Sequence, residues 1–495
     1  MKQAGILCPV FSLKSAYGIG DFGPGATEFL DILRESAVEI WQVLPLNPLS
    51  FGHSPYQPLS SFAGETLFIS LEGLYADGLI RNLPKAWGIP APRVDYEMSK
   101  IFKTPYFKEA FKTFSERPEK PADYEVFLKE SWVIPYGIFT ALKEKNQDAP
   151  WMMWSEADKA VKTIEELPED LRARACLEIF LQYEFRVQWD RIREAAKARG
   201  IRIMGDIPFY VGGDSLDVFS ARDRFFLDSQ GYPTKVAGVP PDYFSETGQR
   251  WGNPIYDWEK MEEDGFAFWT ERLLGTAKLY DMVRIDHFLA FHAYWEIPAE
   301  SETAINGEWV PAPGLKLFAK VLPLLPGTEI VAEDLGLVSE KVYEMRDKFG
   351  FPGMNVLQFT MQNPEFKVQD RMVTYTGTHD NTTAGAYMAS LFEEDSAFIT
   401  DLFREAGIDT DAEPKSWQLI QYAMQVPTDY VIVPVQDVLD LDEKSRMNVP
   451  GTVGALNWTW KLTSYEAFRE RMKDFRELVI AGKGKEKQNG GFKTL

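Results

Sequence analysis

Eight short apolar runs recur along this chain, and most of them end in a polar or acidic residue where the run stops. Their length and β-branched content are typical of buried strands. The runs are Gly5–Val10, Glu39–Leu46, Ile201–Ile207, Met282–His287, Glu329–Leu335, Met354–Phe359, Val373–Asp380 and Tyr430–Leu439. Amphipathic stretches typical of helices lie between several of them, at Thr27–Ser36, Trp269–Tyr280 and Ser339–Phe349. Eight strands that alternate with helices favour an α/β fold with a closed parallel sheet, the (β/α)8 or TIM barrel.

Two spacings are too long for a simple strand-helix unit: Asn47 to Gly200, and Pro208 to about Phe268. We interpret both as large rim insertions. Residues 66–199 are predicted to form a mainly helical insertion between strands 2 and 3, with a charged helical face over Glu165–Arg199. Residues 208–268, rich in Gly, Pro and aromatic residues, are predicted to form a loop-rich insertion between strands 3 and 4. We therefore expect residues 1–495 to form a single catalytic barrel without a separate C-terminal β-sandwich domain.

The formal charge of −21 excludes several classes of partner. Nucleic acids and anionic membrane surfaces both require a basic patch, so neither is expected as a partner. No window approaches the roughly 18–20 apolar residues of a membrane span, and the first residues do not read as a signal peptide. The two cysteines, Cys8 and Cys176, lack any paired spacing, so we expect buried thiols in a reducing compartment, which is the cytoplasm.

Four carboxylates stand where predicted strands end, which in a barrel of this type is where active sites form. They are Asp206, Asp286, Glu333 and Asp380. Any single one of them could be a helix N-cap or a solvated strand end. Four on strand ends of one barrel indicate a site, because converging carboxylates repel one another unless cations, hydrogen bonds or function hold them together.

Arg284 supplies one such cation. It precedes Asp286 by two residues on the same strand, so both side chains point to the same face and the guanidinium can keep that carboxylate ionised. All four histidines, His53, His287, His292 and His379, lie in or near these segments, either as donors to substrate hydroxyls or as packed residues of the barrel top.

An acid, a nucleophilic carboxylate and a third carboxylate are the groups needed for glycoside chemistry. A divalent metal is the competing use of clustered carboxylates. It is disfavoured because the sequence contains no Asp-rich loop and no His-x-x-x-His pattern.

A set of motifs that extends nearly end to end resembles the amylomaltases, or 4-α-glucanotransferases (disproportionating enzymes), a family related to the α-amylase superfamily. The motifs begin at Tyr17-Gly-Ile-Gly-Asp-Phe-Gly, Trp41-Gln-Val-Leu-Pro-Leu, Ser54-Pro-Tyr-Gln, Gly205-Asp-Ile-Pro, Asp214-Ser-Leu-Asp, Gly238-Val-Pro-Pro-Asp-Tyr-Phe, Gly248-Gln-Arg-Trp-Gly-Asn, Arg284-Ile-Asp-His-Phe, Ala332-Glu-Asp-Leu-Gly, Gly377-Thr-His-Asp-Asn and Arg446-Met-Asn-Val-Pro-Gly. Each acidic motif is weakly specific by itself, whereas the set in this order is strongly specific.

The resemblance implies a double displacement with retention at the anomeric carbon. Asp286 would be the nucleophile that forms a covalent glycosyl intermediate, and Glu333 the acid and then the base. Asp380 with His379 would bind hydroxyls of the donor sugar. Arg284 would orient the nucleophile and Asp206 would support the site. Retention also predicts that the carboxyl groups of Asp286 and Glu333 lie roughly 5 to 6 Å apart.

The resemblance also implies sugar-binding residues on the rim. Asp242, Phe244, Gln249 and Trp251 would line the donor groove on a mobile loop, with Ser54 and Tyr56 near the acceptor and Asn457 in contact with sugar from the last strand region. The alternative for Trp251 and Tyr56 is ordinary aromatic packing, although both stand in Gly- and Pro-rich loops, where a core residue is less expected.

α-1,4-Glucans and maltooligosaccharides would be donors and acceptors, with glucose as a further acceptor, and neither an organic cofactor nor an essential metal is implied. The chain departs from the family pattern at Leu289-Ala290, Thr382-Thr383 and Glu65-Thr66, which leaves subsite details and product size open. Two alternatives stay open. An α-glucan hydrolase would use the same carboxylates with water as the acceptor. A non-catalytic glucan-binding protein would have no need of Asp286, Glu333 and Asp380.

Overall fold

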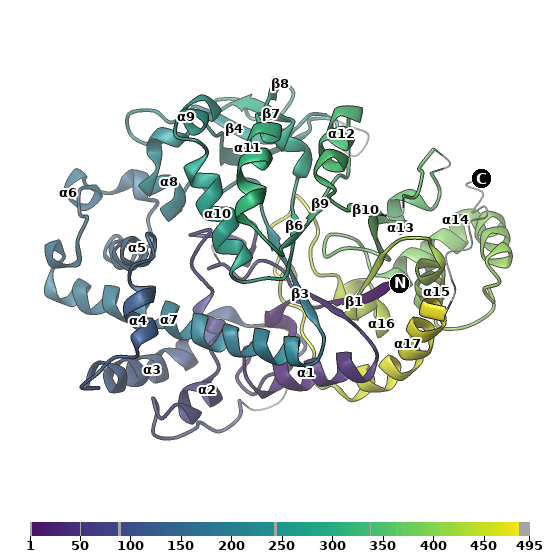
Figure 1. The fold of residues 1–495 in the computed structure, drawn as a ribbon, viewed down its shortest axis with the longest axis horizontal. Coiled ribbons are helices and arrows are strands. Elements are labelled where there is room, and N and C mark those ends of the chain that lie inside the picture. The colour runs from purple at the N-terminus through teal and green to yellow at the C-terminus, as the bar shows by residue number, and fades with distance from the viewer. Residues whose placement is uncertain are drawn as a thin grey trace.

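Eight parallel strands form the centre of the molecule, in the order β10-β11-β12-β1-β2-β3-β6-β9. The computed structural model describes residues 2–49, 51–87, 91–241, 245–336, 338–363, 365–369 and 371–484. The strands are β1 (Gln3–Leu7), β2 (Ile40–Gln42), β3 (Arg202–Ile207), β6 (Met282–Ile285), β9 (Glu329–Ala332), β10 (Gly353–Val356), β11 (Met372–Tyr375) and β12 (Tyr430–Pro434). The amide of Ala332 at the end of β9 donates to the carbonyl oxygen of Pro352, just before β10, at 2.8 Å. The sheet therefore curls into a nearly closed barrel, and each of the eight predicted runs overlaps one strand (Figure 1).

The barrel interior is a packed core to which every strand contributes. Its members are at most 1% exposed, and they are Leu7, Ile40, Met204, Met282, Val331, Met354, Val356, Val373, Tyr375 and Ile432. Long apolar side chains from all strands fill the space that a closed eight-stranded sheet encloses. The predicted (β/α)8 fold class is confirmed.

Several strands end earlier than their apolar runs. β12 stops at Pro434, which has no N–H to donate to a neighbouring strand, and the run continues as the short helix α16 (Val435–Val438). Likewise β10 is followed directly by α13 (Leu357–Thr360). The α16 turn is buried throughout, as a strand would be, whereas only Leu357 of α13 is buried. Apolar character alone could not mark either boundary.

The segment 66–199 contains helices at the left of Figure 1. They are α2 (Leu71–Ala76), α3 (Tyr96–Ser115), α4 (Ala122–Phe127), α5 (Val133–Lys145), α6 (Glu156–Lys159) and α7 (Glu169–Ala198). The longest, α7, follows Pro168, carries Glu169 and Asp170 in its first turn where they complement the helix dipole, and ends before Gly200 at φ 72°. These features at its two ends help to stabilise this 30-residue helix, although its net hydrophobicity is low.

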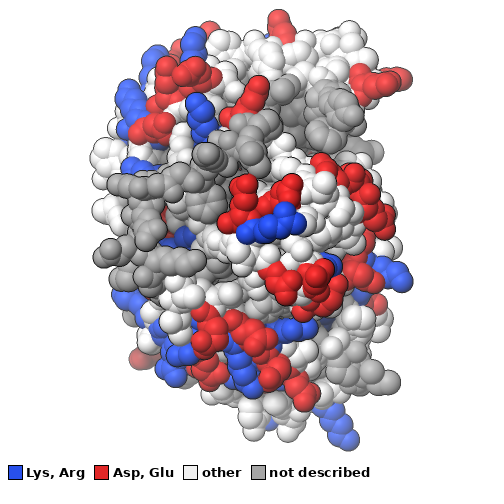
Figure 2. Space-filling view, turned by 90° about the vertical axis from the view of Figure 1, so that its right-hand side faces the viewer, with Lys and Arg blue, Asp and Glu red and all other residues white. Residues whose placement is uncertain are grey.

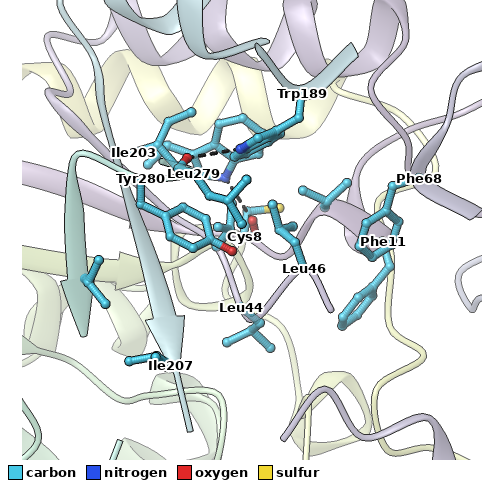
Figure 3. Packing of buried hydrophobic residues seen from close by; sticks show 14 of the residues in the cluster. Cys8, Phe11, Leu44, Leu46, Phe68, Trp189, Ile203, Ile207, Leu279 and Tyr280 are labelled. Atoms are coloured by element: carbon cyan, nitrogen blue, oxygen red, sulfur yellow. Dashed lines mark hydrogen bonds between the residues drawn. The ribbon is translucent and has the colours of Figure 1, made fainter. Parts of the chain in front are cut away.

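One indole ring anchors α7 to the barrel. Trp189 packs against Tyr280 with ring centroids 6.3 Å apart, and its Nε1 donates to the carbonyl oxygen of Leu279 at 3.0 Å (Figure 3). Tyr280 in turn lies directly on the backbone of Gly205, where a Cβ would stand 2.2 Å from the tyrosine ring. The glycine before Asp206 therefore allows the close packing that holds this strand end in place.

A second, antiparallel sheet lies at the top of Figure 1, in the order β5-β4-β7-β8. β4 (Lys235–Val239) and β5 (Gln249–Pro254) come from the segment that we expected to be loop-rich, together with α8 (Leu216–Ser220) and α9 (Trp258–Glu263). β7 (Ala293–Pro298) and β8 (Glu308–Pro311) follow β6 in the sequence. The connection from β3 to β6 and the connection from β6 to β9 therefore build this sheet together.

The remaining long helices cover the outside of the barrel. They are α1 (Pro24–Glu35), α10 (Ala267–Ala277), α11 (Gly314–Val321), α12 (Glu340–Phe349), α14 (Ala384–Glu405), α15 (Lys415–Gln425) and α17 (Glu466–Gly484). Beyond β12, the part of the chain that the structure describes adds no further sheet strand before it reaches Gly484.

The surface charge, the helices and the cysteines can each be compared with what composition predicted. On the face that carries α14, α15 and α17, acidic side chains gather in several groups with basic ones interspersed (Figure 2). A search of the described residues finds no helix long and apolar enough to cross a membrane. Both cysteines are free thiols, Cys8 buried as expected and Cys176 half-buried, because it lies on the partly exposed first half of α7.

Candidate active site

Three of the four predicted carboxylates lie at the carboxyl ends of adjacent strands. Asp206 is the penultimate residue of β3, while Asp286 and Glu333 directly follow β6 and β9. β3 pairs with β6 and β6 with β9, and the register places Asp206 beside Arg284. Asp380 follows β11 by five residues and reaches the same region through the turn that contains His379.

Arg284 connects the three adjacent carboxylates. Its Nη1 lies 2.6 Å from Asp206 Oδ2, and its Nη2 lies 3.0 Å from Asp286 Oδ1 and 3.9 Å from Glu333 Oε2. The contact with Asp286 predicted from the alternation of the strand is present. One nitrogen of Arg284 therefore lies within 4 Å of an oxygen of both Asp286 and Glu333, so the two carboxyl groups share a single guanidinium.

Glu333 is suited to hold a proton. Its side chain is 15% exposed, against 29% for Asp286. Burial raises the pKa of Glu333 from 4.5 to about 8; Arg284 lowers this pKa, while the neighbouring Asp286 raises it. The amide of His287 donates to Glu333 Oε2 and holds the carboxyl in place. The raised pKa of Glu333 therefore favours its protonated form, next to the guanidinium that also contacts Asp286.

His287 turns the chain sharply after Asp286, at φ 52° in the left-handed region. A non-glycine residue in this region is strained, and such strain gathers at functional sites. Burial lowers the pKa of His287 to about 4, so the imidazole is neutral at pH 7. Among the described residues, neither His287 Nε2 nor the buried Asp206 Oδ1 has a hydrogen-bond partner. Both atoms are candidates to bind a ligand.

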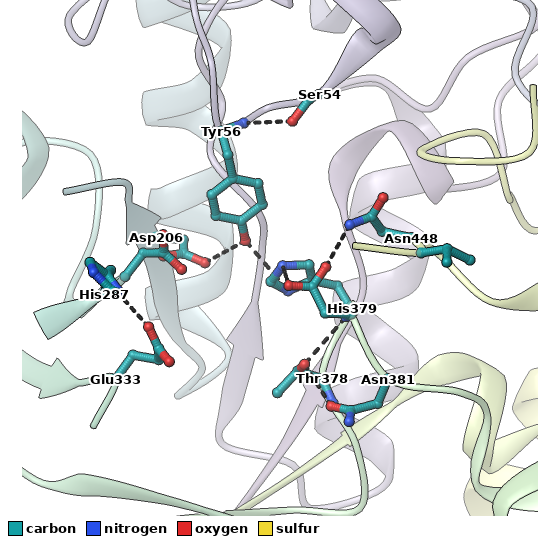
Figure 4. Close-up of polar contacts among 12 residues, drawn as sticks. Ser54, Tyr56, Asp206, His287, Glu333, Thr378, His379, Asn381 and Asn448 are labelled. Carbon is teal, nitrogen blue, oxygen red and sulfur yellow. Dashed lines mark hydrogen bonds and ion pairs between the residues drawn. The ribbon is translucent and has the colours of Figure 1, made fainter. Parts of the chain in front are cut away.

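Tyr56 comes from a distant loop and completes the polar network (Figure 4). Its hydroxyl donates to Asp206 Oδ2 at 2.8 Å and lies 3.4 Å from His379 Nδ1, while its ring stacks on the His379 ring at a centroid distance of 5.0 Å. Burial raises the pKa of Asp206. Ser54 Oγ accepts a hydrogen bond from the Tyr56 amide at 3.3 Å and so shapes this loop.

Asp380 is held from two sides. His379 Nε2 lies 3.4 Å from Asp380 Oδ2, and Asn448 Nδ2 donates to Asp380 Oδ1 at 2.7 Å (Figure 4). Arg446 Nη2 donates to the Asp380 carbonyl oxygen at 2.6 Å. With a side chain 43% exposed, Asp380 remains open to a ligand.

Two of the predicted donor-groove residues lie on β5. The Trp251 ring is half-buried and meets the His287 ring edge-on at a centroid distance of 4.9 Å, and its Nε1 donates to Gln249 Oε1 at 3.1 Å. These two residues therefore adjoin the carboxylate cluster through His287. Asp242 and Phe244 lie outside the described residues.

Asn457 makes its hydrogen bonds within its own loop. Its Oδ1 accepts from the Val449 amide at 3.3 Å, and its Nδ2 donates to the carbonyl and hydroxyl oxygens of Thr452, both at 3.1 Å. The side chain closes the loop that begins just after Asn448. A direct contact of Asn457 with sugar stays a prediction.

Comparison with known proteins identifies the family. A sequence profile described as 4-alpha-glucanotransferase matches residues 8–466. This chain belongs to the 4-alpha-glucanotransferase family. It is 41% identical to the 4-alpha-glucanotransferase of Thermus thermophilus over 495 residues, which cover 97% of this chain and 98% of that protein. It is 40% identical to the 4-alpha-glucanotransferase of Streptococcus pneumoniae serotype 4 over 93% of each chain.

A solved structure agrees with this assignment. The amylomaltase from Streptococcus agalactiae, determined in complex with acarbose, superposes with a TM-score of 0.89 at 33% identity, covering 98% of this chain and 99% of that one. The predicted family resemblance is confirmed. The chain is thus a 4-alpha-glucanotransferase, a glycosyl-transferring enzyme of α-glucan metabolism.

Three residues of the carboxylate cluster were not singled out from the sequence for the contacts that the structure shows. Asn448 and Arg446 lie in a motif that supported the resemblance, yet no pattern in the sequence connects them to Asp380, 66 or more residues away. The amide of His287, which binds Glu333, could not be predicted because the positive φ at this position has no glycine to signal it.

The described residues contain no group of three or more His, Cys, Asp or Glu side chains arranged to hold a metal ion. The clustered carboxylates contact Arg284, Tyr56, Asn448 and the His287 amide instead. The expectation that the enzyme needs neither metal nor organic cofactor stays a prediction.

Proposed function

We propose that the transferase moves a segment of an α-1,4-glucan to the 4-hydroxyl of a glucose or glucan acceptor by a retaining double displacement. Asp286 is the nucleophile and Glu333 the general acid and base. The observation that carries the proposal is the shared guanidinium of Arg284, which lies 3.0 Å from Asp286 and 3.9 Å from Glu333. These distances are compatible with the separation of about 5–5.5 Å typical of retaining enzymes, which leaves no room for a water between them.

In the first half-reaction, an Asp286 oxygen attacks the anomeric carbon and the glycosidic C1–O4 bond breaks. The departing oxygen takes the proton of Glu333, so the acceptor-side fragment leaves as a neutral alcohol. Arg284 holds Asp286 in place for the attack, because its Nη2 lies 3.0 Å from Asp286 Oδ1. Asp380, with His379, holds hydroxyls of the donor sugar.

In the second half-reaction, the incoming 4-hydroxyl loses its proton to the Glu333 carboxylate as its oxygen bonds to the anomeric carbon. The bond between that carbon and Asp286 breaks, which restores both carboxyl groups to their starting states. His287 Nε2 and Asp206 Oδ1, both without partners among the described residues, are available to bind sugar hydroxyls.

Incubation of the pure protein with maltotriose alone tests this function. Transfer produces glucose together with a ladder of longer maltooligosaccharides, whereas hydrolysis produces glucose and maltose without longer chains. Retention is read separately from the configuration of the newly formed glycosidic bond in the longer chains, by proton NMR. Inverted product would contradict the roles assigned to Asp286 and Glu333.

The pKa of Glu333 sets the alkaline limit of the activity. The acid must be protonated when the free enzyme meets its donor, so kcat/KM is expected to fall as pH rises through about 8, roughly tenfold for each further pH unit. Initial rates on maltotriose between pH 5 and pH 10 test this, with melting curves as the control for unfolding. A kcat/KM that stays flat to pH 10 would remove the protonated Glu333 from the mechanism.

We further propose that Trp251 binds donor sugar. Trp251→Ala is expected to raise the apparent KM for maltooligosaccharides about threefold to tenfold, because a half-buried indole offers a flat apolar face for stacking. Trp309→Ala, which removes a 42% exposed indole from β8 of the same sheet, is the matched control and should leave KM unchanged. A large drop in Tm with unchanged kinetics would show that Trp251 is a packing residue.

A cytoplasmic location is also proposed, supported by the half-buried free thiol of Cys176, which would be open to oxidation in an oxidising compartment. Enzyme activity should accordingly be found in the cytoplasmic fraction of the source cells.

A further inference from the structure

A pocket on the outside of the barrel lies between α15 and α17, which run side by side at the right of Figure 1. It has a volume of about 230 Å³ and shares no lining residue with the carboxylate site. That volume is below the roughly 300–1,000 Å³ of pockets for drug-sized ligands, so it suits a ligand of one ring.

The floor of the pocket is rigid and carries a polar atom without a partner. The indole of Trp417 is 8% exposed, and its Nε1 donates to the carbonyl oxygen of Val438 at 3.0 Å, which fixes the ring. Gln418 is 1% exposed, and its Nε2 donates to the carbonyl oxygens of Thr410 at 3.1 Å and Ala412 at 2.7 Å. Its Oε1 is buried and has no hydrogen-bond partner among the described residues. A buried carbonyl of this kind is costly unless a ligand or water satisfies it.

The rim supplies both donors and acceptors. Within the described ranges, the side chains of Arg471, Asp474 and Gln421 form no hydrogen bond or ion pair, although the Arg471 guanidinium lies 5.9 Å from the centroid of the Trp417 ring. Glu413 on the same rim pairs with Lys415. Two carboxylates disfavour an anionic ligand, and Arg471 disfavours a cationic one. The lining therefore favours a neutral ligand with hydroxyl groups around an apolar ring.

We infer that this pocket is a second, non-catalytic site that binds one glucosyl unit of an α-glucan chain. The inference rests on the proposed function, in which such chains are donor and acceptor. A hexose fits the chemistry because its apolar face can pack on the apolar lining while its hydroxyls meet the polar rim. The apolar lining includes Pro414, Trp417 and Leu478, and the polar rim Gln421, Arg471 and Asp474.

The effect of the pocket on activity depends on the length of the glucan chain. It lies on the outer helices, whereas the carboxylates lie at the strand ends, so only a long glucan can occupy both sites at once (Figure 1). A chain held in the pocket has a raised effective concentration at the active site without any new contact there. The pocket should therefore lower the apparent KM for amylose and leave maltotriose unaffected.

The test compares the full-length enzyme with the double variant Arg471→Ala/Gln421→Ala. The variant is expected to raise the apparent KM for amylose about threefold to tenfold, with kcat on amylose and both constants on maltotriose unchanged. Arg476→Ala, an exposed arginine on α17 that does not line the pocket, is the matched control. If the double variant melts at a lower temperature than wild type, the single variant Gln421→Ala replaces it in the test.

Binding is measured independently of turnover by native electrophoresis through gels with and without amylose. The intact pocket and the double variant are compared in an Asp286→Asn background. A failure of the proposed mechanism would then appear as residual turnover and not as a change in retardation. Weaker retardation of the pocket variant supports the site. Equal retardation of the two forms, together with an unchanged KM for amylose, would overturn the site. An equal rise in the KM for maltotriose would also overturn it, because the substitutions would then disturb the active site itself.

Discussion

Asp286→Asn is expected to lower kcat on maltotriose by at least about ten-thousandfold, because a neutral amide oxygen cannot form the glycosyl intermediate that a carboxylate forms. The substitution preserves shape, and the amide oxygen still lies beside Arg284, so glucan binding and thermal stability should persist. A loss of this size corresponds to about 5 kcal/mol of transition-state stabilisation.

Single-turnover rates with maltotriose and calorimetric titration with a longer maltooligosaccharide separate the two effects. Asp401→Asn removes an exposed carboxylate on α14 that pairs with the exposed Arg404, and should behave as wild type. If Asp286→Asn keeps activity within about tenfold of wild type, the nucleophile is another residue.

Glu333→Gln is expected to lower kcat/KM on maltotriose by about a thousandfold or more, because the glycosidic oxygen would leave without a proton. A donor whose leaving group needs no proton separates this role from a structural one. The variant should therefore form the glycosyl intermediate from a maltosyl fluoride far better than from maltotriose. Glu340→Gln, an exposed change at the start of α12, is the matched control.

The same substitution should stabilise the fold at alkaline pH. The pKa of Glu333 is higher in the folded state, about 8, than its ordinary value of 4.5, so the folded protein holds this proton more tightly than the unfolded chain. Its contribution to stability is full below about pH 4.5 and is lost as pH rises through about 8. Glu333→Gln should thus raise Tm relative to wild type more at pH 9 than at pH 5. A variant that is less stable at pH 9 would contradict the buried, protonated state of this carboxyl.

The barrel strands could be predicted because local sequence carries their signal. A strand buried on both faces must be apolar along its length, and the following residue is free to be polar, so Asp286 after β6 and Glu333 after β9 stand out in the sequence. The strict alternation along a strand also predicted that Arg284 and Asp286 share a face, as their 3.0 Å contact shows.

The antiparallel rim sheet could not be predicted in the same way. β4 pairs with β7, more than fifty residues away, and β5 contains Gly252 at φ 82° and ends at Pro254, so its sequence resembles a loop. Pairing of this kind depends on partners brought together by the barrel, and no local period records it.

The amino-acid sequence alone determines which acidic residues end the strands and in what order. Each of them can be recognised locally, because it stands at the end of an apolar run of fewer than ten residues. Only the folded chain decides which group does what among them. The proton affinity of Glu333 comes from burial and from Asp286 on the adjacent strand end. The geometry of Asp380 comes from Asn448, and that of Asp206 from Tyr56, 150 residues away. Desolvation and hydrogen bonding act over a few ångströms in space, whatever the separation along the chain, and so they exist only once the barrel has closed.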